Sequence, residues 1–396
     1  MAASFAVMFG VWVPHAGFGV FLPVLSQEFA WSRGAISLAA SLNLLLGGAI
    51  SFGVGAASDR YGPRRILALS GLLVGAGYIL ASTVGALWHF YLWVGGVLGI
   101  GMSGVYIVPT ATVSRWFVER RGLALGVLLT GINLAYVTAG PLVALLIDTV
   151  GWRAAYVALG GLVLAVVVPA SAFMKVAPSG EGSRVAAAPG LEHSAPAAPR
   201  GASVTFREAV RDRRLWLLVL TWVLQGAALM TVAVHVVAYL HDRGTTLEAA
   251  SLALTIYGVS SMAGRLLFGA AADRIGTTPT FYLCSVLQVV GLAWVAVGPS
   301  LWLFYPLIMA FGLGAAGADT AVVKAASEVF GVRAIGAIIG IVGVGWRCGA
   351  ALGPAVAGFL HDATGSYGIA FGLASAGVLL SLAFFTLGMS SSRRAA

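Results

Sequence analysis

Long apolar runs separated by short polar segments follow one another along almost the whole chain. A helix that crosses a hydrocarbon core about 30 Å thick needs about 18 to 25 predominantly apolar residues. Windows of that length predict twelve membrane spans, near residues 5–26, 36–57, 66–84, 88–112, 122–148, 152–174, 215–240, 249–272, 277–297, 301–325, 335–360 and 367–389. The pattern therefore predicts an all-α membrane protein with twelve transmembrane helices.

The composition agrees with a protein that crosses the membrane many times. Of the 396 residues, 59% are hydrophobic and 9% are charged, whereas a soluble domain carries about a quarter charged residues. The first apolar run begins almost at Met1 without a basic segment before it and continues beyond Val20. We therefore expect a membrane helix there and not a cleaved signal peptide. The two cysteines, Cys284 and Cys348, lie in apolar spans and are expected to be free thiols.

The basic residues predict the orientation. With Met1 in the cytoplasm, 18 of the 23 Lys and Arg residues fall on the cytoplasmic side. Three fall on the other side (Arg33, Arg153 and Arg243), and Arg265 and Arg347 lie inside spans. This excess predicts cytoplasmic termini, and it explains the net charge of +9 without a nucleic-acid partner. Scarce lysine beside abundant Ala, Gly and Arg is typical of a GC-rich bacterial genome, so we expect a bacterial inner-membrane protein.

The chain divides into two similar halves. Residues 175–214 are rich in Ala, Pro, Gly, Ser and Arg, which predicts a flexible cytoplasmic linker between residues 1–174 and 215–396. Motifs of the first half recur 213 or 214 residues later: Gly55 to Gly62 as Gly269 to Gly276, Ser114 to Phe117 as Ser327 to Phe330, Gly140-Pro141 as Gly353-Pro354, and Asp148 as Asp362. The repeat predicts two pseudo-symmetric six-helix bundles with a binding site between them near the membrane midplane.

One repeated motif resembles the signature loop of the major facilitator superfamily. It reads Gly55-x-x-x-Asp59-Arg60-x-Gly62-x-Arg64-Arg65, and Asp273 and Arg274 repeat its central pair. The resemblance implies that these charges contact neighbouring helix ends and help to gate the cytoplasmic side. It covers essentially the whole chain.

A narrower resemblance is to the monocarboxylate transporters and their bacterial relatives, which include the oxalate–formate antiporters. It rests on the segments Gly19 to Ser37 and Trp116 to Gly131 and on the triplet Gly264-Arg265-Leu266. The resemblance implies that Arg265 binds a substrate carboxylate, that Arg347 lies at or next to a second cation of the oxalate exchangers, and that Tyr106 contacts substrate. The chain departs from the animal members, which have an aspartate where Ser261 stands and a lysine in the first helix.

Arg265 carries the central functional prediction. It lies eight residues before Asp273, about 12 Å at 1.5 Å per helical residue, and so near the middle of the membrane. A charge there needs an anionic partner. A protein carboxylate or backbone carbonyls are one possibility, but the only acid that we place inside a span is Asp319. Substrate binding is therefore favoured, because a guanidinium group fits a carboxylate with two parallel hydrogen bonds.

Other polar residues inside spans extend the predicted site. Arg347 lies 14 residues from both Arg333 and His361, hence at the midplane, and either forms a second anion clamp or pairs with Asp319. Two unbalanced arginines would favour a dicarboxylate. Asp319 either carries a proton or forms a plain ion pair. His15, beside Pro14, suits proton coupling or substrate binding, with a structural bond to a carbonyl as the alternative. Asn133, at the repeat position of Arg347, and Tyr106 complete the set, although helix–helix hydrogen bonding is an alternative for Asn133.

These features predict a transporter and not an enzyme. The chain has no phosphate-binding loop for ATP, no histidine spacing for a metal and no nucleophile–base set, so no cofactor is expected. We expect a monomeric secondary active transporter of small organic anions, mono- or dicarboxylates, working by alternating access as a proton symporter or an anion exchanger. The alternatives are a drug or sugar efflux permease of the same fold and a transporter-like membrane sensor.

Overall fold

The computed structural model describes residues 1–117, 121–174, 206–297, 301–331 and 335–390, and these residues form helices without a strand. Within the described chain, ten helices are long and apolar enough to cross a membrane. Two of these are interrupted, at Gly17 and at Gly151, and the shorter helical stretch Thr277–Leu292 is also apolar. The all-α fold class predicted from the hydrophobic pattern is confirmed.

The elements before the predicted linker account for the first six predicted spans. They are α1 (Ala2–Ala16), α2 (Phe18–Phe29), α3 (Arg33–Tyr61), α4 (Pro63–Ala81), α5 (Leu87–Phe90), the π-helix η1 (Tyr91–Val97), α6 (Leu98–Trp116) and α7 (Arg121–Ala172). The pair α1 and α2 forms one candidate span that is interrupted at Gly17. In α7, Gly151 has a φ of 79° and a ψ of 160°. This non-helical residue separates the two stretches that the sequence predicts as two spans.

The elements after the linker are α9 (Phe206–Arg211), α10 (Arg213–His241), α11 (Leu247–Arg274), α12 (Thr277–Val297), α13 (Leu301–Phe330), α14 (Ile335–Thr364) and α15 (Gly368–Ser390). Of the predicted linker, residues 175–205 lie outside the described residues, and most of residues 206–214 are helical. They include α9, and α10 begins two residues earlier than predicted. The carboxylate of Asp212 explains this start, because it accepts a hydrogen bond from the backbone N–H of Arg214 at 2.8 Å.

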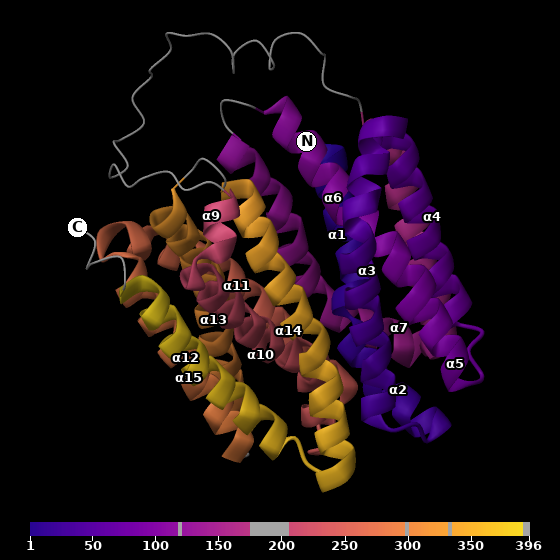
Figure 1. Ribbon diagram of the computed structural model, residues 1–396. Helices are drawn as coiled ribbons and strands as arrows, with labels where there is room; N and C mark the ends of the chain where they lie inside the picture. Colours follow the sequence, from indigo (N-terminus) through magenta and orange to yellow (C-terminus); the bar gives the residue numbers. More distant parts are fainter. Residues whose placement is uncertain (118–120, 175–205, 298–300, 332–334, 391–396) are drawn as a thin grey trace.

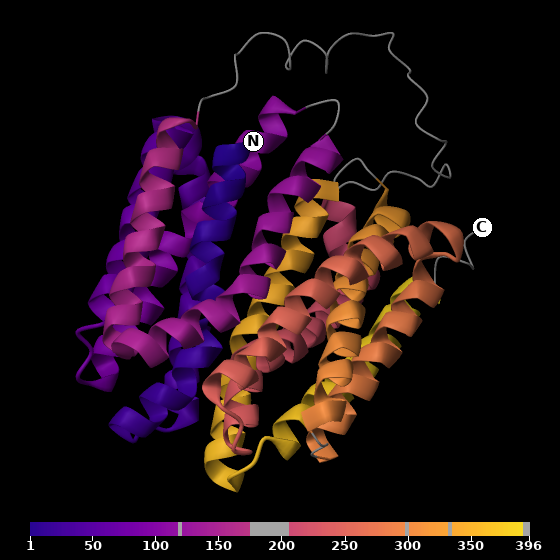
Figure 2. The ribbon, with the colours of Figure 1, turned by 180° about the vertical axis from the view of Figure 1, so that it is seen from behind.

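The elements up to Ala172 lie on one side of the molecule and those from Phe206 on the other (Figures 1 and 2). We call the end that holds Ala2, Tyr61 and Arg274 the N-terminal face, and the end that holds Phe29, Arg33 and Thr364 the opposite face. The two sides meet where α3 packs on α14, α7 on α11 and α2 on α10.

The sequence repeat extends to the backbone. Three pairs of left-handed residues are separated by 214 positions: Ala30 and Gly244, Gly62 and Gly276, and Gly151 and Gly365. The φ values of Gly62 and Gly276 are 89° and 90°, a region that glycine adopts without the steric cost of a Cβ atom. The helices that follow the first pair also begin alike, because Ser32 and Thr246 each cap the helix by accepting from the backbone N–H three residues on.

Close contacts between the two sides lie in the middle of the membrane helices and toward the opposite face. Thr255 of α11 donates to the carbonyl of Val137 at 2.7 Å, and a Cβ atom on Gly258 would lie 2.7 Å from the Val137 nitrogen. Gly34 of α3 and Gly358 of α14 are similarly close, because a Cβ atom on Gly358 would lie 2.6 Å from Cα of Gly34. Arg265 lies about two helical turns beyond Tyr257, on the N-terminal side of these α7–α11 contacts.

Candidate functional site

Arg265 is an exposed arginine on α11. Its charge interacts with Tyr257 of the same helix, with Asp319 of α13 and with Tyr106 of α6. Among the described residues, no ion pair within 4.0 Å includes Arg265. The guanidinium group is therefore accessible, with the nearby Asp319 charge as its electrostatic partner.

Arg347 reaches across the boundary between the two sides. It is half-buried on α14, and its Nη1 donates to the hydroxyl of Ser51 on α3 at 3.1 Å. Its Cδ atom would lie 3.3 Å from a Cβ atom on Gly48, so a larger residue there would displace the arginine. The recorded partner of Arg347 is thus Ser51, and its alternative pairing with Asp319 is not found among the described ion pairs.

Tyr106 lies within electrostatic range of both arginines. It is half-buried on α6, and both Arg265 and Arg347 interact electrostatically with its hydroxyl group. The arginines come from α11 and α14, and the tyrosine comes from the other side of the molecule. The charges of two residues that the sequence predicts as substrate-binding therefore act on the hydroxyl group of a third.

Asp319 has a partner that sequence reasoning missed. The indole Nε1 of Trp222 on α10 donates to Asp319 Oδ1 at 2.8 Å. The charge of Arg265 also acts on Asp319, so the carboxylate has a neutral hydrogen-bond donor and lies within the field of a cation. Trp222 and Ser51 carry no pattern that marks them in the sequence, and only the packing of α10 on α13 and of α3 on α14 identifies them.

His15 lies at a different place from the arginines. It lines a cavity of about 40 Å³, room for about three water molecules. Most of the lining is apolar or aromatic, and it includes Asn43 and Leu44 of α3 but no charged residue. Leu44 is one helical turn before Gly48, on the side of the opposite face. The cavity therefore lies next to the Arg347 region, on the side that is nearer to the opposite face.

Two further polar residues inside spans, Asn133 and His235, are buried. Asn133 is buried in α7 at 8% exposure, and no hydrogen bond between it and a described arginine is found. His235 of α10 has structural partners, because its ring bonds to the Tyr367 hydroxyl at 3.0 Å and to the Pro354 carbonyl at 2.9 Å.

The signature loop and its repeat differ in what they contact. Gly62 ends α3 with its positive φ, the Arg60 guanidinium lies 5.3 Å from the centre of the Tyr61 ring, and Arg64 and Arg65 are exposed. A Cβ atom on Gly55 would contact Ile107 at 3.7 Å. The side chain of Asp59 lies outside the described residues. In the repeat, Arg274 is exposed, and Asp273 pairs with Lys324 at 2.6 Å, which connects α11 to α13.

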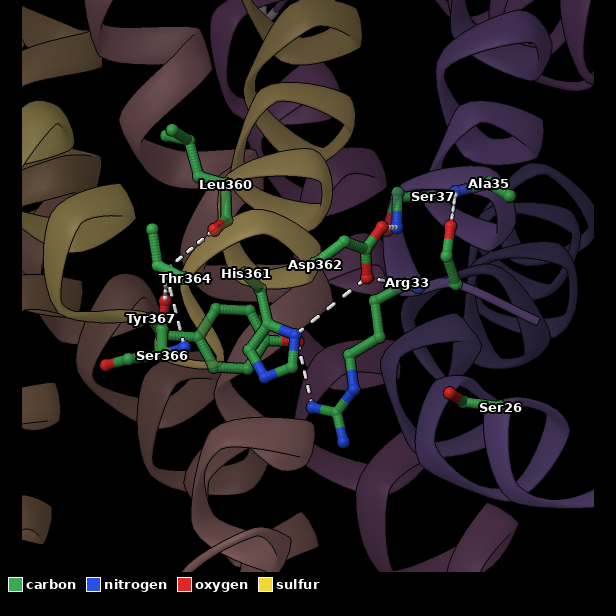
Figure 3. A network of polar contacts seen from close by, with 12 residues as sticks. Ser26, Arg33, Ala35, Ser37, Leu360, His361, Asp362, Thr364, Ser366 and Tyr367 are labelled. Atoms are coloured by element: carbon green, nitrogen blue, oxygen red, sulfur yellow. Dashed lines mark hydrogen bonds and ion pairs between the residues drawn. The ribbon is translucent and has the colours of Figure 1, made fainter. Parts of the chain in front are cut away.

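A polar network at the opposite face joins the two sides. We call its five residues the Arg33 clasp: Arg33, Asp242, His361, Asp362 and Tyr367. Arg33 is 9% exposed, and its guanidinium group donates to Asp242 at 2.6 Å and to the Tyr367 hydroxyl at 3.0 Å. Figure 3 shows Arg33 pointing from α3 toward His361 and Tyr367. The sequence predicts the side of the membrane for Arg33 but not this network.

Comparisons with known proteins identify the family. The sequence profile of the Major Facilitator Superfamily matches residues 1–250 and, in a second match, residues 230–395. The chain belongs to this superfamily. It is 29% identical to human monocarboxylate transporter 11 over 98% of this chain and 82% of that protein. It is 28% identical to monocarboxylate transporter 13 of Bos taurus over 96% and 87%. It is also 26% identical to the uncharacterized MFS-type transporter YhjX of Escherichia coli K12 over 82% of each chain.

Solved structures support the same fold. A bacterial homologue of the human lysosomal transporter Spinster, in an inward-facing and occupied conformation, matches with a TM-score of 0.78. That match covers 98% of this chain and 95% of the homologue at 13% identity. The nucleoside transporter NupG matches with a TM-score of 0.75 at the same identity, over 98% of this chain and 100% of NupG. The resemblance to the major facilitator superfamily that the motifs indicate is confirmed.

Proposed function

We propose that this superfamily member is a secondary active transporter of small organic anions, with mono- or dicarboxylates as substrates. The observation that carries the proposal is the presence of two cations, Arg265 and Arg347, within a helical membrane bundle, both near enough for their charges to act on Tyr106. Two cations in one region attract an anion and repel cationic drugs. The relatives named monocarboxylate transporters support the same substrate class.

The proposed topology has twelve crossings in two six-helix bundles, residues 1–174 and 215–396. Its support is the 214-residue repeat of backbone turns and the interruption of α7 at Gly151. With the excess of Lys and Arg, the N-terminal face is cytoplasmic in a bacterial inner membrane. The contacts toward the opposite face then correspond to a state that is closed to the outside. We propose a monomer as the transporting unit.

The proposed binding chemistry follows from the exposed guanidinium group of Arg265. Its planar fork presents two N–H donors to a carboxylate, and Arg347 and the Tyr106 hydroxyl add donors from the neighbouring helices. The carboxylate of Asp319 and the substrate anion both interact with the positive charge of Arg265. Protonation of Asp319 therefore strengthens the binding of the anion. This competition supports proton symport, and exchange against a second anion is the other coupling mode. His15 and Asn133 stay in the proposal as secondary polar groups, His15 through its own cavity.

Uptake of labelled lactate, oxalate and succinate into proteoliposomes tests the proposal, with and without a pH gradient. Arg265→Ala removes a charge-assisted bidentate contact worth about 1.5–3 kcal/mol, so we expect uptake at low substrate to fall about 10- to 150-fold. Arg243→Ala is the matched control, because it removes an exposed arginine at the opposite face. Wild-type uptake by the Arg265→Ala protein would place the substrate elsewhere, and no uptake of any acid by the wild type would refute the substrate class.

A further inference from the structure

The Arg33 clasp divides its charges unequally between the two sides of the molecule. Arg33 belongs to α3, whereas Asp242, His361, Asp362 and Tyr367 come from the C-terminal side. His361 lies between the two carboxylates, with Nε2 3.6 Å from Asp242 and Nδ1 4.0 Å from Asp362. Its ring also packs against Tyr367 at 4.3 Å (Figure 3). One cation thus faces two carboxylates and a histidine.

Asp362 holds the start of α3 from the other side of the molecule. Its Oδ1 accepts from the backbone N–H of Arg33 at 2.9 Å, and its Oδ2 accepts from the backbone N–H of Gly34 at 2.8 Å. The first N–H groups of a helix have no partner within the helix, and a carboxylate there also gains from the helix dipole. These bonds exist only while α14 lies against α3, so Asp362 favours the closed arrangement.

Tyr367 extends the network inward. It is 2% exposed, and burial raises the pKa of its hydroxyl group, so the group stays protonated. The hydroxyl accepts from Arg33 and donates to Nδ1 of His235. The second ring nitrogen of His235 then donates to the carbonyl of Pro354. This arrangement fits a neutral His235. Asp242, Asp362 and His361 are the other titratable groups of the network, at its outer end.

We propose that the Arg33 clasp is a proton-operated gate, which protons from the opposite face open. The charged and titratable groups that face the two carboxylates are Arg33, His235, His361 and Tyr367. A proton on Asp242 weakens the ion pair with Arg33. A proton on Asp362 weakens its bonds to the start of α3. A proton on His361 draws both carboxylates toward their own side of the molecule and repels Arg33. Every protonation step therefore weakens the attraction between the two sides.

The proposal rests on the proposed function in one respect, since a gate needs alternating access. Its consequence for transport is directional. Acid at the opposite face opens the protein to the side from which a proton and an anion would enter together. The clasp would then link the proton gradient to the conformational change at a place separate from Arg265 and Asp319.

Distance measurements between spin labels test the gate without substrate. The labels are placed at Thr83→Cys and Glu248→Cys, two exposed positions at the opposite face on different sides of the molecule, in a background with Cys284 and Cys348 replaced by alanine. We expect one short-distance population at about pH 7.5. Burial and the charge of Arg33 lower the pKa of His361, so the acid condition must lie well below the usual His pKa of about 6.5. At about pH 4, the ratio of long to short distances should rise on the order of tenfold.

Charge-neutral variants separate the gate from general acid effects. Asp362→Asn and Asp242→Asn should show the long distance already at about pH 7.5 and a smaller response to acid. Asp148→Asn is the matched control, because Asp148 is the exposed repeat counterpart of Asp362, and it should behave like the wild type. A wild-type distance distribution that does not change with pH would overturn the proposal, even if the variants show the long distance. Acid-driven opening in a protein that transports no carboxylate would support the gate and refute the proposed function.

Discussion

The close approach of Gly34 and Gly358 makes the closed opposite face sensitive to a single methyl group. A Cβ atom on Gly34 would lie 2.7 Å from Cγ of Phe359 and 2.8 Å from Oδ2 of Asp362. Carbon atoms in good contact are about 3.5–4.0 Å apart, so the helices must separate by close to 1 Å. Overpacking of this kind costs about 1–3 kcal/mol. The Gly34→Ala substitution therefore disfavours the closed state without changing a charge.

The cost applies to the closed state alone, because Gly34 and α14 are apart when the face is open. A difference of about 1–3 kcal/mol corresponds to about a 5- to 150-fold larger open fraction. Ser37 reports this fraction, since this residue of α3 is fully buried and bonds to His235 of α10 on the other side of the molecule. In a Ser37→Cys protein without other cysteines, we expect Gly34→Ala to increase the rate of labelling by a membrane-impermeant thiol reagent by that factor.

A glycine outside the contact provides the control. A Cβ atom on Gly85 would meet nothing within 4 Å, so Gly85→Ala should leave the labelling rate unchanged. Gly358→Ala should act like Gly34→Ala, because its Cβ atom would lie 2.6 Å from Cα of Gly34. Equal labelling rates for wild type and Gly34→Ala, in proteins of equal thermal stability, would refute the inference that this contact controls closure.

Two further predictions concern single hydrogen bonds. Trp222→Phe removes the donor to Asp319, so we expect the pH at which uptake is half-maximal to change. Trp216→Phe, also on α10, is the control and should leave that pH unchanged. An unchanged pH profile in Trp222→Phe would show that Asp319 takes no part in proton coupling. Asp212→Ala removes the cap at the start of α10 and should lower the free energy of unfolding by about 1 kcal/mol at neutral pH. Burial alone would raise the pKa of Asp212, but the hydrogen bonds and charge of Arg214 lower it overall. The stabilisation by the carboxylate is therefore present at neutral pH and lost as the pH falls through the lowered pKa, so the difference in melting temperature between variant and wild type should shrink in acid.

Much of the fold could be predicted from the sequence because the bilayer imposes simple demands. Apolar runs must be long enough to cross it and must satisfy their own backbone as helices. The repeat of Gly62 as Gly276 correctly indicated matching turns, since a residue with φ near 90° has to be glycine there. The predicted linker ends in helical residues, where Asp212 provides a helix cap that composition does not reveal.

The candidate site divides in the same way. The sequence by itself determined that Arg265 and Arg347 lie inside membrane spans, because a charged residue within an apolar run can be recognised without knowledge of the fold. Only the tertiary structure decided that both act on Tyr106, that Asp319 bonds Trp222, and that Arg33 meets Asp242 across a separation of 209 residues. These contacts depend on which faces of α3, α10, α11 and α14 turn toward one another. Helix packing sets those faces through the fit of small residues such as Gly34 and Gly358, and no local pattern records which helix will fill the space that a glycine leaves.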